Sequence, residues 1–378
     1  MNIVILNTNS FGGNYEYSRC LAKAYLVNKD VESCLVLIPE NAAQEEDHLF
    51  KKVLISDHSP IKNKLFKKLY FLFRSVLNPI RTYQYLKKVP SSLVIFNDFE
   101  QISSFIWVPL FRKLKNKHHF TVILHDPDRD EYVPIKALSI YTMKRVMSIM
   151  NSALYHEVLP DREYYNRDIP KIKIPHGIYF HESFDKECLA RLQSQKGDNF
   201  LIGILGNIRE EKNYELVIDA LTQVKKVKLL IAGNASSSKV SIEKYKQQIN
   251  RLELEDRVIW LQKFMSDDEF QAAIKSCDVV LLYYKSTFTS QSGVLNLIAP
   301  HKKWIIVSDV PSALRETVKT FGLGSIVPLS LAALVSELNM MGKEERAGYE
   351  KAWMNYMNYA SWDNHVQIVL DALKQKRI

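Results

Sequence analysis

The stretch LIGILGNIREEKNY, residues 201–214, places a buried strand, a glycine and two cations in one short run. Residues 201–205 have the length and apolar composition of a strand buried on both faces, and residues 214–224 have the spacing of a helix. Similar pairs of apolar runs and helical patterns follow one another along the chain. Strands separated by helical segments of about 10–15 residues are typical of βαβ units and parallel sheets.

This alternation runs twice, once in each half of the chain. Strands are predicted at Ile3–Leu6, Ser33–Ile38, Leu93–Phe96, Thr121–Leu124, Leu201–Leu205, Lys228–Ala232, Val258–Leu261, Val279–Tyr283, Trp304–Ser308 and Ser325–Val327. The predicted helices include Tyr15–Val27, Gln101–Lys115, Tyr214–Val224, Ser241–Leu252, Asp267–Cys277, Gly293–Ile298, Ser312–Thr320 and Leu331–Met341. Because 378 residues exceed one ordinary core, we expect two doubly wound α/β domains, at 1–190 and 191–355, and a final helix within 356–378.

Composition narrows the class of protein. Hydrophobic residues make up 47% of the chain and charged residues 25%, which excludes wholesale disorder. No apolar run reaches the ~18–20 residues needed to span a bilayer, and residues 1–6 resemble a strand rather than a secretory signal. The four cysteines are scattered, so we expect reduced thiols and a cytoplasmic protein. The net charge of +9 indicates an anionic partner.

Glycine is scarce, with 12 in the chain, and several of these follow predicted strands: Gly12 and Gly13, Gly206, Gly233 and Gly293. Ligands of open α/β sheets bind beyond the carboxyl ends of strands, and glycine lets a backbone approach a ligand closely. Single turn glycines would need no such explanation. Their recurrence at equivalent places favours a shared ligand site.

Two segments after predicted strands carry anion-binding chemistry. In the first, Arg209 and Lys212 follow Gly206, and both can bind phosphate oxygens. The alternative is a solvated loop in which these cations pair with Glu210 and Glu211.

The second segment is YYKSTFTSQSGVL, residues 283–295. It joins a strand end, a loop rich in hydroxyl groups and a helix that begins near Ser292. Free N–H groups at a helix N-terminus favour anions. The alternative is plain N-capping by Ser290 or Ser292.

Together these two segments resemble the donor-binding half of retaining GT-B glycosyltransferases, the family-4-like group with a Ser-x-Ser-Gly helix start. The resemblance covers residues 200 to about 328, and extends weakly to the N-terminal half through residues 12–13, 125–126 and 174–177. It implies a GT-B fold of two Rossmann-like domains facing a cleft, in which the N-terminal domain, 1–190, binds the acceptor and the C-terminal domain, 191–355, binds the nucleotide-sugar. It also implies that the donor diphosphate is bound by Gly206, Arg209 and Lys212 and by Ser290, Ser292 and Gly293.

The resemblance assigns roles in the N-terminal half as well. The loop at Gly12-Gly13-Asn14 would lie near the phosphates across the cleft, and His125 would face the transferred sugar. The final helix, with Trp362, would pack back on the N-terminal domain.

Two features depart from the family pattern. Most members carry two glutamates eight positions apart in the second segment, the second of which binds ribose. Phe288 and Asn296 stand at those places here. The usual Gly-x-Pro before the next strand is replaced by residues 301–304, His-Lys-Lys-Trp. The resemblance therefore does not define how ribose and base are recognised.

The segment HDPDRDE, residues 125–131, follows a buried strand with a histidine and four acids. It fits an acid/base pair, a metal site or a solvated loop. We expect no metal, because Arg209, Lys212 and helix N-termini would neutralise a diphosphate.

The basic charge is concentrated in Lys62–Lys88, which holds eight cations and no acid, interleaved with apolar and aromatic residues. Such a segment fits an interfacial helix on anionic lipid. A nucleic-acid-binding face would look similar, but no base-stacking motif accompanies it. A core helix with a solvated basic face is the third alternative.

These observations predict a glycosyltransferase that moves a sugar from a nucleotide diphosphate-sugar, UDP- or GDP-linked, to a glycan or lipid-linked acceptor. The predicted setting is bacterial surface polysaccharide or glycolipid synthesis on the inner face of the cell membrane, with no nucleic-acid partner and no cofactor. The residues predicted to act in catalysis are His125, Asp126, Arg209 and Lys212. Those predicted to bind the donor are Gly12, Gly13, Gly206, Asn207, Gly233, Asn234, Thr289, Ser290, Gln291, Ser292, Gly293 and Asn296. A sugar-nucleotide epimerase of the same fold and a non-catalytic scaffold are the alternatives.

Overall fold

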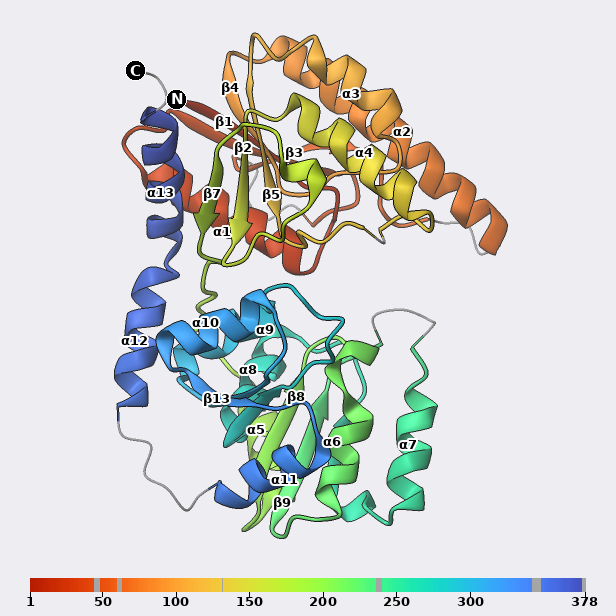
Figure 1. Ribbon diagram of the computed structural model, residues 1–378, viewed down its shortest axis with the longest axis vertical. Helices are drawn as coiled ribbons and strands as arrows, with labels where there is room; N and C mark the ends of the chain where they lie inside the picture. The colour runs from red at the N-terminus through yellow and green to blue at the C-terminus, as the bar shows by residue number, and fades with distance from the viewer. Residues whose placement is uncertain (44–47, 60–62, 131, 236–239, 342–347, 376–378) are drawn as a thin grey trace. The chain divides into compact units, whose positions relative to one another are not determined.

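A computed structural model describes residues 1–43, 48–59, 63–130, 132–235, 240–341 and 348–375 (Figure 1). The chain forms two compact units, which we describe separately. Unit 1 comprises Met1–Gly177 and Ser361–Ile378, and unit 2 comprises Ile178–Ala360. The division after residue 177 precedes the expected one after residue 190, because helix α5 (Lys186–Lys196) packs against α8 (Asp267–Ser276) of unit 2.

Unit 1 is built on a parallel sheet of seven strands in the order β3-β2-β1-β4-β5-β6-β7. The strands are β1 Asn2–Leu6, β2 Ser33–Pro39, β3 Phe50–Leu54, β4 Ser92–Phe96, β5 His119–Leu124, β6 Ser152–His156 and β7 Lys171–Ile174. The helices are α1 Gly13–Val27, α2 Lys64–Lys88, α3 Ser104–Arg112, α4 Lys136–Ile149 and α13 Trp362–Lys374, with a short 3₁₀ turn at Glu163–Tyr165.

Four strands of unit 1 were predicted, and β3, β6 and β7 were not. Strands β3 and β7 are the two edges of the sheet. Edge strands are covered less completely than central ones, and these two carry lysines, Lys51 and Lys52 in β3 and Lys171 and Lys173 in β7. Their sequences therefore lack the continuous apolar run that marks a buried parallel strand.

The last helix, α13, belongs to unit 1, where it packs against α1. A methyl group on Gly177 would lie 2.1 Å from Cε2 of Trp362, so only glycine leaves room for that ring. His365 Nδ1 lies 2.9 Å from the carbonyl oxygen of Pro175 and fixes the next turn of the helix. The contact between Gly177 and Trp362 thus holds α13 against unit 1.

Unit 2 contains a parallel sheet of six strands in the order β10-β9-β8-β11-β12-β13. The strands are β8 Phe200–Leu205, β9 Val227–Ala232, β10 Val258–Leu261, β11 Val279–Leu282, β12 Trp304–Ser308 and β13 Gly324–Val327. Besides α5 and α8, the helices are α6 Tyr214–Leu221, α7 Ile242–Arg251, α9 Gly293–Ile298, α10 Ala313–Phe321, α11 Leu331–Met340 and α12 Tyr349–Tyr359, with 3₁₀ turns at Glu210–Lys212, Glu255–Arg257 and Ala299–His301.

All six predicted strands of this unit are present, and the expected class, two Rossmann-like parallel-sheet domains, is confirmed. In each sheet the strand order reverses at one place, between β1 and β4 in unit 1 and between β8 and β11 in unit 2. In open parallel sheets, the crevice beyond the carboxyl ends of such a strand pair is the usual ligand site. The residues that follow these four strands are therefore the first candidates for function.

Candidate functional site

Lys212 lies at the carboxyl end of β8, with its side chain almost entirely buried. Its Nζ donates a hydrogen bond to the carbonyl oxygen of Leu205 at 2.5 Å. Burial, with the nearby charge of Arg209 adding to it, lowers the pKa of Lys212 to about 7. A buried ammonium beside a second cation is stabilised by an incoming anion, so this strand end favours a phosphate group.

The alternative in which Arg209 and Lys212 pair with neighbouring acids does not hold in the structure. Glu210 lies 3.5 Å from Lys244 Nζ instead. The backbone carbonyl of Glu211 accepts a hydrogen bond from the N–H of Lys285. The Arg209 side chain is exposed and forms no ion pair with any described residue. Its guanidinium is therefore available for a ligand.

The two segments singled out in the sequence meet at this point. A methyl group on Gly206 would lie 3.2 Å from Cγ2 of Val294, in the first turn of α9, and 3.5 Å from Lys212 Nζ. Gly206 also has a φ of +82°, which disfavours any residue with a side chain. The ends of β8 and β11 thus converge on one small volume that contains a cation.

Ser292 precedes α9 but does not cap it with its side chain. Its Oγ lies 3.1 Å from the hydroxyl of Tyr284, and its N–H donates to Oε1 of Gln291. Helix α9 has only six residues, so its dipole is small. The cations, rather than the helix, therefore supply most of the positive potential.

Helix α10 holds the hydroxyl-rich loop from behind. The N–H groups of Ala313 and Leu314 donate to the carbonyl oxygens of Thr289 and Ser290, at 3.0 and 3.3 Å. Gln291 Nε2 donates to Oγ1 of Thr317 at 2.7 Å. These bonds fix the backbone of the loop before any ligand binds.

Gly233 and Asn234 shape the same edge from β9. A methyl group on Gly233 would lie 2.3 Å from the carbonyl oxygen of Gly206, so glycine is required for the two loops to touch. The N–H of Ile208 donates to the carbonyl of Asn234 at 2.8 Å. Asn207, between these contacts, is exposed. The structure thus accounts for Gly233 and Asn234 by loop packing alone.

Asn296, which was predicted to bind the donor, is hydrogen-bonded within unit 2. Its side chain is fully buried, and its Oδ1 accepts a hydrogen bond from the hydroxyl of Tyr356 at 2.6 Å. Its Nδ2 points to the carbonyl of Ser292 at 3.4 Å. The side chain therefore fastens α9 to α12. Phe288, the other departure, packs on the ring of Tyr284.

In unit 1, His125 follows β5, with Nε2 at 2.7 Å from Oδ1 of Asn97. The amide of Asn97 also donates to the carbonyl of Asn14 and to Oγ of Ser18. Burial lowers the pKa of His125 well below its usual range, so the ring is neutral. Asn97 thus joins His125 to the loop that contains Gly12 and Gly13. Sequence reasoning missed Asn97, although a polar residue directly after a buried strand was the available signal.

His125 belongs to a cluster of rings around the buried Tyr17. The rings of His125, His176 and Trp362 lie 4.6, 5.1 and 4.9 Å from that of Tyr17, all edge-to-face. His156 lies 3.3 Å from His125, between Nε2 and Nδ1. Burial lowers the pKa of His176 to about 4. The rings therefore pack closely around Tyr17, while His125 and His176 themselves stay half-buried.

The acids after His125 are mostly engaged in ion pairs. Asp128 lies 2.7 Å from Arg162, and Asp130 lies 3.1 Å from Lys136. Asp126 is exposed and its backbone carbonyl accepts a hydrogen bond from Arg129. Glu131 lies outside the described residues. Within the described part of the chain, no three side chains of His, Cys, Asp or Glu are grouped so as to hold a metal ion.

Comparison with known families places a domain on this site. Residues 187–338 match the family model described as glycosyl transferases group 1. This range contains both segments at the carboxyl ends of β8 and β11, so unit 2 carries a group 1 glycosyltransferase domain. No curated protein sequence matches the chain.

Solved structures show the same fold over the whole chain. The Anabaena protein Alr3699/HepE in complex with UDP and glucose is 17% identical, with a TM-score of 0.73, and the alignment covers 99% of this chain and 100% of that one. The Thermosynechococcus elongatus sucrose-phosphate synthase is 17% identical, with a TM-score of 0.68 and coverage of 100% and 98%. The α,α-trehalose 6-phosphate synthase from Burkholderia multivorans is 10% identical, with a TM-score of 0.69 and coverage of 99% and 98%. At these identities the likeness shows the GT-B fold.

Proposed function

We propose that this protein transfers a sugar from a nucleotide diphosphate-sugar to a glycan or lipid-linked acceptor, and that Arg209 and Lys212 bind the diphosphate. The observation that carries the proposal is the buried Lys212, hydrogen-bonded to a backbone carbonyl at the strand-order reversal of the group 1 domain. UDP is the first nucleotide to test, since the HepE complexes contain it.

In the proposed reaction, negative charge builds up on the departing diphosphate. Arg209, Lys212 and the N–H groups around Gly293 would stabilise that charge without reorganising, which is how preorganised dipoles and cations accelerate such steps. Arrival of the diphosphate would also draw a proton onto Lys212. We propose that the sugar keeps its anomeric configuration and that His125 acts on the transferred sugar.

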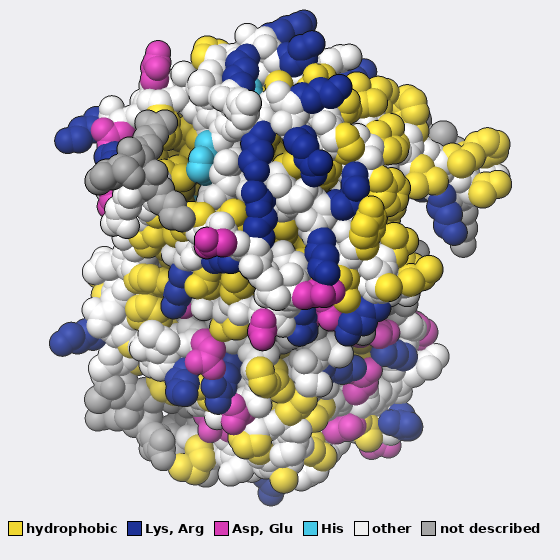
Figure 2. Space-filling model, turned by 45° about the horizontal axis from the view of Figure 1, so that its top comes forward, with side chains coloured by type: hydrophobic (Ala, Val, Ile, Leu, Met, Phe, Trp, Pro, Cys, Tyr) yellow, Lys and Arg dark blue, Asp and Glu magenta, His cyan; other side chains and the backbone are white. Residues whose placement is uncertain are grey.

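We further propose that α2 binds an anionic membrane surface, with the protein on the inner face of a bacterial membrane. The side chains of its first turns are exposed, and among them are apolar residues 42–64% exposed: Leu65, Phe66, Leu69, Phe71, Leu72 and Phe73. A core helix would bury these side chains. Lys67 and Lys68 are exposed beside them, whereas Lys62 lies outside the described residues. Figure 2 shows the resulting mixture of hydrophobic and basic side chains on the projecting end of α2.

Cations interspersed with exposed aromatic and leucine side chains suit the boundary between lipid headgroups and acyl chains. No helix in the described part of the chain combines the length and the apolar character needed to cross a bilayer. The proposed contact is therefore along the surface. Surface polysaccharide or glycolipid synthesis is the setting that such a transferase would serve.

Calorimetric titration with UDP and GDP tests the donor site. A charge-assisted hydrogen bond contributes about 1.5–3 kcal/mol, so Arg209→Ala and Lys212→Ala should each weaken binding by roughly 10- to 150-fold. Lys244→Ala is the matched control, because this lysine of the same unit pairs with Glu215 and should leave affinity unchanged. Wild-type affinity in both Arg209 and Lys212 variants would show that the diphosphate binds elsewhere.

A further inference from the structure

The strand-order reversal of unit 1 also carries a cavity. It opens between the ends of β1 and β4 and is lined from those strands by Leu6, Thr8, Phe96 and Asp98. This is the place in unit 1 that corresponds to the phosphate-binding edge of unit 2. None of the residues predicted to bind the donor lines this cavity, so the donor site does not explain it.

The roof of the cavity is α2 at Pro79. A proline cannot donate to the carbonyl four residues earlier, that of Ser75. The hydroxyl of Ser103 donates to this carbonyl instead, at 2.7 Å. Asn78 is equally fixed, since its Oδ1 accepts a hydrogen bond from the N–H of Ile55. The roof is therefore held in place without a ligand, and the cavity is preformed.

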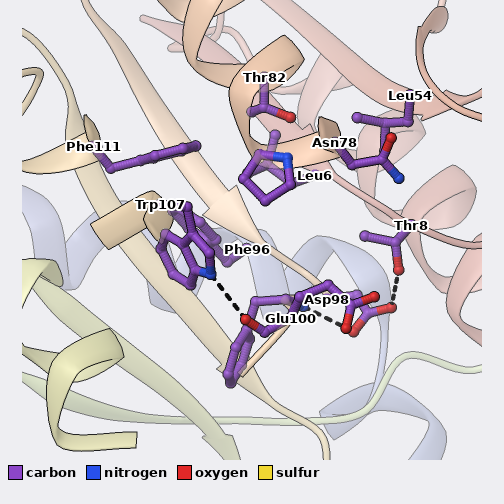
Figure 3. A pocket seen from close by; sticks show the side chains of 12 residues that line it. Leu6, Thr8, Leu54, Asn78, Thr82, Phe96, Asp98, Glu100, Trp107 and Phe111 are labelled. Carbon is purple, nitrogen blue, oxygen red and sulfur yellow. Dashed lines mark hydrogen bonds between the residues drawn. The ribbon is translucent and has the colours of Figure 1, made fainter. Parts of the chain in front are cut away.

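The walls of the cavity are apolar and its rim is acidic. Figure 3 shows Phe96, Trp107 and Phe111 on one side, Asn78 and Thr82 from α2 above, and Thr8 and Asp98 opposite. The cavity is open on one side and has a volume of ≈ 40 Å³, room for about three water molecules. A methyl or acetyl group fits such a space, and a lipid chain does not.

The two carboxylates at the rim differ in what they can still bind. Asp98 is occupied, because it accepts hydrogen bonds from Thr8, Asn9 and the N–H of Phe99. The side chain of Glu100 is 15% exposed, and its one ion pair with a described residue is a long one, 3.9 Å, to Arg74. Glu100 therefore retains free acceptor capacity for a hydroxyl group. Burial, together with the charge of Asp98, raises the pKa of Glu100 to about 7.

We propose that this cavity is a subsite for the sugar acceptor, and that it receives a small apolar group of a neutral acceptor sugar while Glu100 accepts a hydrogen bond from one of its hydroxyls. The apolar walls select the group, and none of the lining residues is a cation that would bind a phosphate. The methyl group of an acetamido substituent and the C6 methyl of a 6-deoxy sugar have the same size and polarity. The cavity therefore recognises a methyl group, which either kind of sugar can supply. The proposal rests on the proposed transferase function.

Ligand-observed NMR tests the subsite with three free sugars as probes: N-acetylglucosamine, a 6-deoxyhexose and glucose, of which only glucose lacks a methyl group. One of the first two should bind about fourfold more tightly than glucose, because burying one methyl-sized group contributes roughly that factor. Saturation should be strongest on its acetyl or C6 methyl protons. Which probe binds distinguishes the two sources of the methyl group.

Two variants on one helix locate the binding. Thr82→Met fills the cavity with a longer apolar side chain and should weaken binding of the preferred probe about tenfold or more. Gln84→Met places the same residue on the exposed side of α2 and should leave binding unchanged. Glu100→Gln should weaken it severalfold while preserving the shape of the side chain. Thermal unfolding and UDP titration of each variant check that both units remain folded.

The outcomes separate this subsite from the donor site. A protein that binds UDP but none of the probes, or binds all three equally, overturns the acceptor subsite alone. Unaltered probe binding in Thr82→Met overturns it as well. A protein that binds a methyl-bearing probe in a Thr82-dependent way but not UDP supports the cavity and refutes the donor site. Failure to bind UDP and every probe refutes both.

Discussion

The protonation of Lys212 offers the sharpest test of the donor site. Its pKa is about 7 in the free protein, against an ordinary value of 10.5. A diphosphate in contact with Nζ would return the pKa toward that ordinary value. In the free protein, Lys212 is then protonated in about half of the molecules at about pH 7 and in about one molecule in a hundred at about pH 9. UDP affinity should therefore fall roughly 50-fold between these two pH values, after allowing for the half-neutral state at pH 7.

The assay is calorimetric titration in buffers of different ionisation enthalpy. Wild-type protein should take up about half a proton per UDP at about pH 7 and nearly one at about pH 9. Lys212→Met keeps the length of the side chain and removes its charge, so its weaker binding should be independent of pH. Lys244→Met should behave as wild type, because this lysine pairs with Glu215. Constant wild-type affinity across this range, with no proton uptake, would refute the assignment of Lys212 to the phosphates.

His125→Ala should bind UDP nearly as wild type does but turn over slowly, because His125 lies in unit 1 whereas Arg209 and Lys212, which are proposed to bind the phosphates, lie in unit 2. Full turnover of this variant in a sugar-transfer assay would assign His125 to structure alone. The pKa of His176 and of His365 is about 4 in the folded state, so the unfolded chain binds protons first as pH falls below about 6.5. The free energy of unfolding of unit 1 should then fall by up to about 1.4 kcal/mol per pH unit for each group down to about pH 4. Denaturant titration measures this, and an acid-insensitive unit 1 would contradict it. The α2 proposal predicts co-sedimentation with anionic vesicles that weakens in high salt and in Lys67→Glu/Lys68→Glu, since each cation contributes about 1 kcal/mol or less near such a surface. Equal sedimentation with neutral vesicles would exclude the electrostatic part of that contact.

The sequence predicted all six strands of unit 2, including the two edge strands β10 and β13, because each appears as an apolar run followed by a helix. In unit 1 it missed the central strand β6, whose sequence SALYH is only partly apolar. The edge strands β3 and β7 have lysines on their uncovered sides, and the periodicity that marks a strand is lost there. Helix α5 was missed for a related reason, because only Cys188 and Leu192 of its eleven residues are buried.

The two segments proposed to bind the donor could be singled out in the sequence, because glycines and cations directly after buried strands are local features. What those side chains contact was decided by the tertiary structure. Asn296 occupies a motif position yet is buried against Tyr356, sixty residues further along the chain. Lys212 bonds to the backbone of β8 rather than to the adjacent glutamates.

The cavity of unit 1 depends still more on long-range packing. Leu6, Thr82, Phe96 and Trp107 come from four elements, and none of them carries a local signal for a ligand. Their shared space exists because the strand order reverses between β1 and β4, while a proline-containing helix is held above that gap by Ser103. Local sequence specifies strands, turns and charges. Which of them enclose a common volume depends on how the strands are ordered in the sheet, and that order is settled only when distant segments pack together.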